Sequence, residues 1–167
     1  MMQSIFSNKL LKPKEKTEQL CGLISNHSVS IDELISFANA SKDPIKATCI
    51  EAIEYVTKSN PSIANKVVFE FAISNLSAKA PRLKWESAKV IANTASLFPD
   101  LIESAINALL KNTEHEGTVV RWSAALALSE IYKLNAKFNK DLYTIFDGIV
   151  EREEKNSIKK IYLSAIK

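Results

Sequence analysis

The fold of this chain is decided by the stretch Val120-Arg121-Trp122-Ser123-Ala124-Ala125-Leu126-Ala127-Leu128. An apolar residue followed by a basic one opens this stretch, which continues as an alanine-rich helical pattern. The same apolar–basic pair opens three further apolar stretches, at Ile45-Lys46, Leu83-Lys84 and Ile158-Lys159. The steps between the four pairs are 38, 37 and 38 residues. A fixed period of this length indicates an array of structural repeats.

The composition indicates an all-α protein. The chain has 167 residues, of which 46% are hydrophobic and 25% charged, as is usual for a globular domain. It contains only three glycines and five prolines, which favours long helices joined by short turns. The net charge of +3 is too small to indicate nucleic-acid binding on its own.

Each repeat is expected to be a helix hairpin whose second helix begins at the apolar–basic pair. The first helix of the first unit begins after the capping residue Ser30, and those of the later units cover about 62–78, 100–111 and 139–153. One hairpin cannot bury its apolar faces alone, so neighbouring hairpins stack into a continuous core. We therefore predict a right-handed α-solenoid forming one domain, with units at about 30–59, 60–97, 98–135 and 136–167. Residues 1–29 are predicted to form a helical cap, with helices over 4–11 and 14–26.

The repeat unit resembles a HEAT repeat of the armadillo-like helical family. The residues that carry this resemblance are the turn Asp43-Pro44-Ile45-Lys46 and the stretch beginning at Val120-Arg121. Two departures from the family pattern are that Ala80 replaces the turn aspartate and that lysine replaces arginine in three of the four copies. The resemblance implies that the second helices line a concave face and that such a protein acts as a binding scaffold.

The candidate binding residues lie on the predicted second helices. Trp85 and Trp122 occupy the same repeat position, directly after the basic residues Lys84 and Arg121, and Lys89 lies one helical turn after Trp85. Exposed indoles beside cations are typical of a binding hot spot for a protein or peptide. Two structural alternatives stay open: the tryptophans pack between repeats, or the basic residues pair with turn carboxylates and helix ends of neighbouring repeats.

The sequence gives no support for catalysis, a metal or a cofactor. It has no glycine-rich phosphate loop, no nucleophile elbow and no metal-ligand spacing, and it has only two histidines. Cys21 and Cys49 fall in apolar helical patterns and are expected to be reduced core thiols. No secretory signal is visible and no apolar run is long enough to cross a membrane, so a cytoplasmic protein is expected.

The leading functional hypothesis is a non-enzymatic scaffold that binds a protein or an extended peptide on its concave face. The alternative is a nucleic-acid-binding protein related to the DNA alkylation-repair proteins, some of which are built from similar repeats. A third interpretation is a structural module whose exposed terminal repeat pairs with another copy of the chain. The sequence does not determine the oligomeric state.

Overall fold

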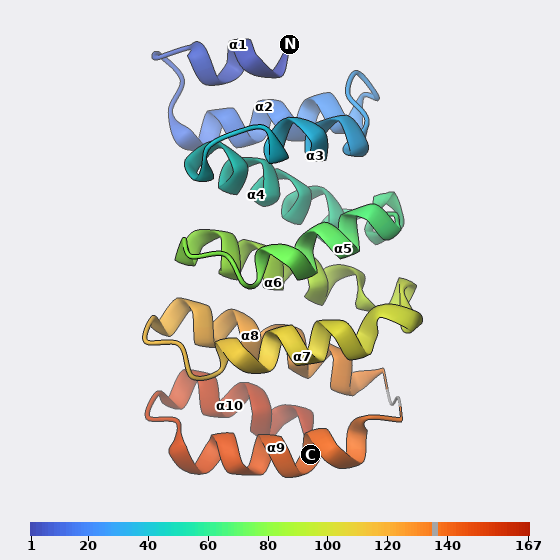
Figure 1. Cartoon of the computed structure of the whole chain (residues 1–167), viewed down its shortest axis with the longest axis vertical. Helices are drawn as coiled ribbons and strands as arrows, with labels where there is room; N and C mark the ends of the chain where they lie inside the picture. Colours follow the sequence, from blue (N-terminus) through green and yellow to red (C-terminus); the bar gives the residue numbers. More distant parts are fainter. Residues whose placement is uncertain (135–136) are drawn as a thin grey trace.

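The computed structural model describes residues 1–134 and 137–167, and every regular element among them is helical. The helices stack in chain order along the long axis of the molecule, with the two ends of the chain at opposite ends of the stack (Figure 1). The first helices of the hairpins are α1 (Met2–Ser7), α3 (Ile31–Asn39), α5 (Lys66–Asn75), α7 (Ile102–Asn112) and α9 (Asn139–Arg152). The second helices are α2 (Pro13–Ser25), α4 (Asp43–Ser59), α6 (Pro81–Thr94), α8 (Thr118–Lys133) and α10 (Asn156–Ala165).

The second helices form one tightly packed layer. Each of α2, α4, α6, α8 and α10 packs extensively against the next, whereas successive first helices contact one another much less. Small residues permit this approach, because Ala47, Ala88 and Ala125 are all fully buried in the layer. Closer packing along one layer shortens that side of the stack. The second helices therefore line the concave face.

Local signals fix where several helices begin. Ser30 accepts a hydrogen bond from the Glu33 backbone N–H, and the Glu33 carboxylate accepts one from the Ser30 N–H, forming a capping box at the start of α3. Proline occupies the first turn of α2, α4 and α6, where its missing N–H leaves no helical hydrogen bond unmade.

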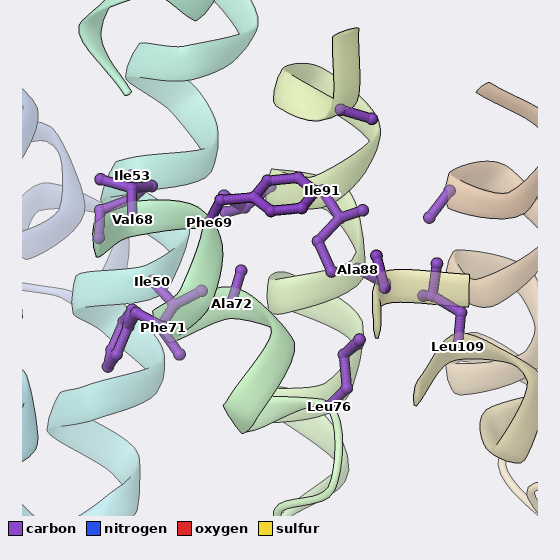
Figure 2. Close-up of a cluster of buried hydrophobic side chains, with 14 of the residues drawn as sticks. Ile50, Ile53, Val68, Phe69, Phe71, Ala72, Leu76, Ala88, Ile91 and Leu109 are labelled. Carbon is purple, nitrogen blue, oxygen red and sulfur yellow. The ribbon is translucent and has the colours of Figure 1, made fainter. Parts of the chain in front are cut away.

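One hydrophobic core runs through the whole stack, from Ile5 near the N-terminus to Tyr162 in the last helix. Figure 2 shows its central part, where side chains of α4, α5, α6 and α7 meet. Phe69 of α5 lies 5.0 Å, between ring centroids, from Phe98, which precedes the next hairpin. Contacts of this kind join each hairpin to the following one, so the repeats share their core rather than each having its own.

The predicted helix limits were wrong in two places. The helix α1 ends at Ser7 rather than near Leu11, because the Asn8 side chain accepts the Leu10 backbone N–H and turns the chain outward. The helix predicted over 62–78 is divided into a short 3-10 turn, η1 (Pro61–Ile63), and α5, which Asn65 caps by accepting the Val68 N–H. Two other 3-10 turns, η2 (Ala95–Leu97) and η3 (Pro99–Leu101), lie between α6 and α7. The predicted limit between the third and fourth units, at 135/136, lies outside the described residues.

Ser87 offers a test of the packing of the second-helix layer. Its hydroxyl is fully buried and has no hydrogen-bond partner among the described residues, and Cys49 and Ala124 occupy the same repeat position in the neighbouring units. Ser87→Ala is expected to raise the free energy of unfolding by about 1 kcal/mol, because it removes an unsatisfied buried group and improves helix propensity. Urea unfolding followed by circular dichroism measures the change.

The matched control is Ser123→Ala. Ser123 is equally buried, but its hydroxyl donates to the Val120 carbonyl at 2.8 Å. Both substitutions replace serine by alanine within a helix and gain the same helix propensity. They differ in that Ser123→Ala also removes a hydrogen bond. A stabilisation by Ser123→Ala as large as that by Ser87→Ala would contradict this account.

Candidate functional site

The concave face carries two neighbouring hollows. One has a volume of about 510 Å³ and lies among α4, α6 and α8. Its walls are formed by Glu54, Tyr55, Lys58, Lys89, Ala92, Asn93, Trp122, Leu126 and Glu130. The other, of about 540 Å³, lies between α2 and α4. Tyr55 lines both, so the two hollows adjoin at this residue, and we call the pair of them the concave groove.

The two tryptophans have different surroundings despite their shared repeat position. Trp122 is 37% exposed and forms part of the groove wall, where Tyr55 is 52% exposed. Trp85 is only partly exposed, and its indole N–H donates to the buried Glu86 carboxylate at 3.0 Å. Of the predicted pair, Trp122 is therefore an exposed aromatic residue in the groove, whereas Trp85 is hydrogen-bonded to a residue of its own helix.

Lys89 lies in the groove wall and is held by two carboxylates. Its ammonium nitrogen is 3.1 Å from Glu86 Oε2 and 3.9 Å from Glu54 Oε2. Burial raises the pKa of Glu86, while Lys89 and the Trp85 N–H act in the opposite direction. Two further pairs lie on second helices: Arg82 of α6 is 2.7 Å from Glu51 of α4, and Lys133 is 2.7 Å from Glu130 within α8. These cations of the second helices are thus already matched by carboxylates.

Lys84 and Arg121 connect successive repeats. The Lys84 ammonium donates to the Leu76 carbonyl and to Asn112 Oδ1, each at 3.0 Å, and burial lowers its pKa. Arg121 donates from Nε to Glu153 at 3.0 Å and from Nη1 to the carbonyls of His115 and Glu116. These are the contacts expected if the basic residues pair with turn carboxylates and helix ends of neighbouring repeats. What either residue binds outside the chain stays a prediction.

Of the five residues predicted for binding, the structure brings Trp122 and Lys89 together in the groove, and it places Lys84 and Arg121 at inter-repeat contacts. Sequence reasoning missed Tyr55, although the repeat register points to it. Steps of 38 and 37 residues connect Tyr55 to Asn93 and Glu130, which lie in the same wall.

The fold matches solved structures of helical-repeat proteins at low sequence identity. A designed armadillo repeat protein in complex with the peptide (KR)4 has a TM-score of 0.71 at 17% identity, over 99% of this chain and 78% of that one. The chain has a HEAT- and armadillo-like repeat fold. An engineered protein has a TM-score of 0.75 at 14% identity, over 92% of this chain and 71% of that one.

A third similar structure is a natural protein. A chain from the complex of CpcE and CpcF of phycocyanin lyase from Nostoc sp. PCC7120 has a TM-score of 0.61 at 15% identity, over 90% of this chain and 98% of that one. The sequence matches no protein-family model and no curated protein. These likenesses show the fold alone.

Two further properties of the described residues bear on the site. None of their helices combines the length and apolar character needed to cross a membrane. Cys21 and Cys49 are free thiols, and burial raises the pKa of Cys21 to about 11 and of Cys49 to about 12. Both therefore remain protonated at neutral pH and are poor nucleophiles.

Tryptophan fluorescence tests the difference between the two indoles. Trp85→Phe leaves only Trp122, which is expected to be quenched strongly by acrylamide. Trp122→Phe leaves only the partly buried Trp85, which is expected to be quenched less and to emit at shorter wavelength. Equal quenching in the two variants would show that the environments do not differ as described.

The Arg121–Glu153 contact predicts a pH-dependent contribution to stability. Burial alone would raise the pKa of Glu153, but hydrogen bonds from Arg121 and from the Lys155 and Glu154 N–H groups outweigh it and lower the pKa. Because the pKa is lower in the folded state, the stabilisation is complete above the unfolded-state value, about 4.3, and is lost as the pH falls through the folded-state value. Glu153→Gln is expected to lower the free energy of unfolding by about 2 kcal/mol at pH 7.

That difference should shrink on acidification below about pH 4, and urea unfolding at several pH values measures it. The exposed Glu151 supplies the control, and Glu151→Gln should change stability little at any pH. A loss from Glu153→Gln that is equally large at pH 3 and pH 7 would contradict the assignment.

Proposed function

We propose that this protein is a non-enzymatic scaffold that binds an extended segment of another protein in its concave groove, with the cytoplasm as its expected compartment. The observation that carries the proposal is the exposure of Tyr55 and Trp122 in the wall of one groove. Large aromatic side chains supply much contact area at little cost in conformational entropy, and they are enriched in binding hot spots.

The electrostatics of the groove favour a polypeptide over a nucleic acid. Lys89 is paired with Glu54 and Glu86, and Arg82 with Glu51. A polyanion would have to compete with these carboxylates for the cations and would meet their negative charge. An extended polypeptide brings both donors and acceptors of hydrogen bonds and side chains that can fill the two hollows. The peptide-bound designed armadillo protein illustrates that a similar fold can serve this purpose.

A peptide-display selection tests the proposal directly. A random library is selected on the wild-type protein, and the dissociation constants of the recovered peptides are then measured for groove variants. Trp122→Ala and Tyr55→Ala are each expected to weaken binding about tenfold or more, as truncation of a hot-spot residue does.

The matched control is Val67→Ala. Val67 is 46% exposed but lies on α5, in the outer layer of first helices. Peptides that bind the groove should be insensitive to it. Recovered peptides that respond to Val67→Ala and not to the groove variants, or strong salt-dependent binding of duplex DNA in place of peptides, would overturn the proposal.

A further inference from the structure

The hollow between α2 and α4 is the more apolar of the two that make up the concave groove. Cys21 of α2, Val56 of α4 and Ile63 of η1 line it. Val56 is buried and the other two are half-buried, so the apolar wall exists before anything binds. Its volume of about 540 Å³ lies in the range of pockets that hold a ligand. This hollow can therefore receive a large side chain.

The charged residues of this wall are matched within the chain. The Lys14 ammonium nitrogen lies 3.8 Å from the Glu18 carboxylate. The Glu51 carboxylate accepts hydrogen bonds from Arg82 at 2.7 Å and from the Thr17 hydroxyl at 3.1 Å. A charged side chain that entered the hollow would lose its hydration and would have to compete for one of these partners. The hollow therefore favours an uncharged side chain.

Two aromatic rings from different segments also line this hollow. Tyr55 of α4 is 52% exposed, and His27 lies in the turn that follows α2. Pairs of aromatic rings gain energy beyond their buried area. The half-buried sulfur of Cys21 adds a second type of contact that is favourable with a ring. These neighbours favour an aromatic side chain over an aliphatic one.

The His27 ring is present at a cost to stability. The backbone of His27 has a φ of 60°, in the left-handed region, where a residue with a Cβ is strained and glycine is not. The turn is closed by the neighbours of His27, since the Asn26 side chain accepts the Ser28 N–H at 2.9 Å. A glycine would suit this backbone better, so the turn itself does not account for the imidazole.

We propose that this hollow is the anchor pocket of the concave groove and receives an aromatic side chain of the bound segment, with Cys21, His27 and Tyr55 contacting the ring. The inference rests on the proposed function, because the side chain belongs to the extended segment that the groove binds. An aromatic residue enclosed in a pocket is the type of contact that carries most of the binding energy of an interface. The segment is thus recognised first by its aromatic residue.

The first experiment titrates the isotopically labelled protein with N-acetyl-tryptophanamide and follows its amide chemical shifts by NMR. Saturable shifts are expected at Cys21, His27 and Ile63, and N-acetyl-lysinamide should cause none. The control Trp122→Ala removes a ring from the other hollow and should leave the titration unchanged. Shifts that do not saturate, equal shifts with the lysine probe, or shifts confined to the other hollow would overturn the proposal.

A side chain that fills the hollow should abolish this binding. Cys21→Phe is expected to remove the saturable shifts while the helical circular dichroism spectrum is kept. The wild-type chain gives an independent readout, because N-acetyl-tryptophanamide should slow the alkylation of Cys21 by iodoacetamide. Cys49 is fully buried and should react slowly with or without the probe. An unchanged rate of alkylation at Cys21 would overturn the proposal.

Peptides recovered on the wild-type protein separate this inference from the proposed function. They are expected to carry an aromatic residue whose replacement by alanine weakens binding about tenfold or more, and Cys21→Phe should cause a similar loss. Peptides that respond to Trp122→Ala but to neither of these changes would overturn the anchor pocket and leave the scaffold function standing. The titration with N-acetyl-tryptophanamide needs no peptide, so its result is valid whether or not the selection succeeds.

For His27, stability and binding are expected to change in opposite directions. His27→Gly should raise the urea midpoint of unfolding, because glycine adopts this φ freely. It should also weaken the binding of N-acetyl-tryptophanamide about threefold, because a contact between rings is lost. The control Ser28→Gly lies in the same turn at a negative φ, and it should lower the midpoint slightly and leave binding unchanged. An unchanged affinity in His27→Gly would overturn the role of His27 in the pocket.

Discussion

The close approach of successive second helices is the constraint on which the rest of the structure depends. Ala88 and Ala125 supply small side chains at one repeat position, where the first unit has Ile50. Replacing either alanine by a larger residue would separate neighbouring hairpins along the concave side, because a core at crystal-like density has no free space to absorb it. The curvature of the stack and the shape of the groove both follow from this spacing.

Polar contacts add to the apolar packing in aligning successive hairpins. Lys84 and Arg121 each reach defined acceptors in the next repeat. Removing one partner of such a buried contact leaves a charge unsatisfied, so the contacts favour one alignment of the hairpins. The basic residue that recurs in the sequence therefore has a structural role in at least two of its four positions.

The repeat period was sufficient to predict an all-α stack of helix hairpins, because helical periodicity and turn residues act over a few neighbouring positions and recur in each unit. The period could not distinguish Trp85 from Trp122, which share one repeat position. Their difference arises because Glu86 is buried beside Trp85 and accepts its indole N–H, while the equivalent of Glu86 next to Trp122 is Ser123, which bonds to its own helix. Three features depend on contacts between helices far apart in the chain, and only the packed structure decides them. They are the exposure of each tryptophan, the pairing of each cation and the meeting of the two hollows at Tyr55.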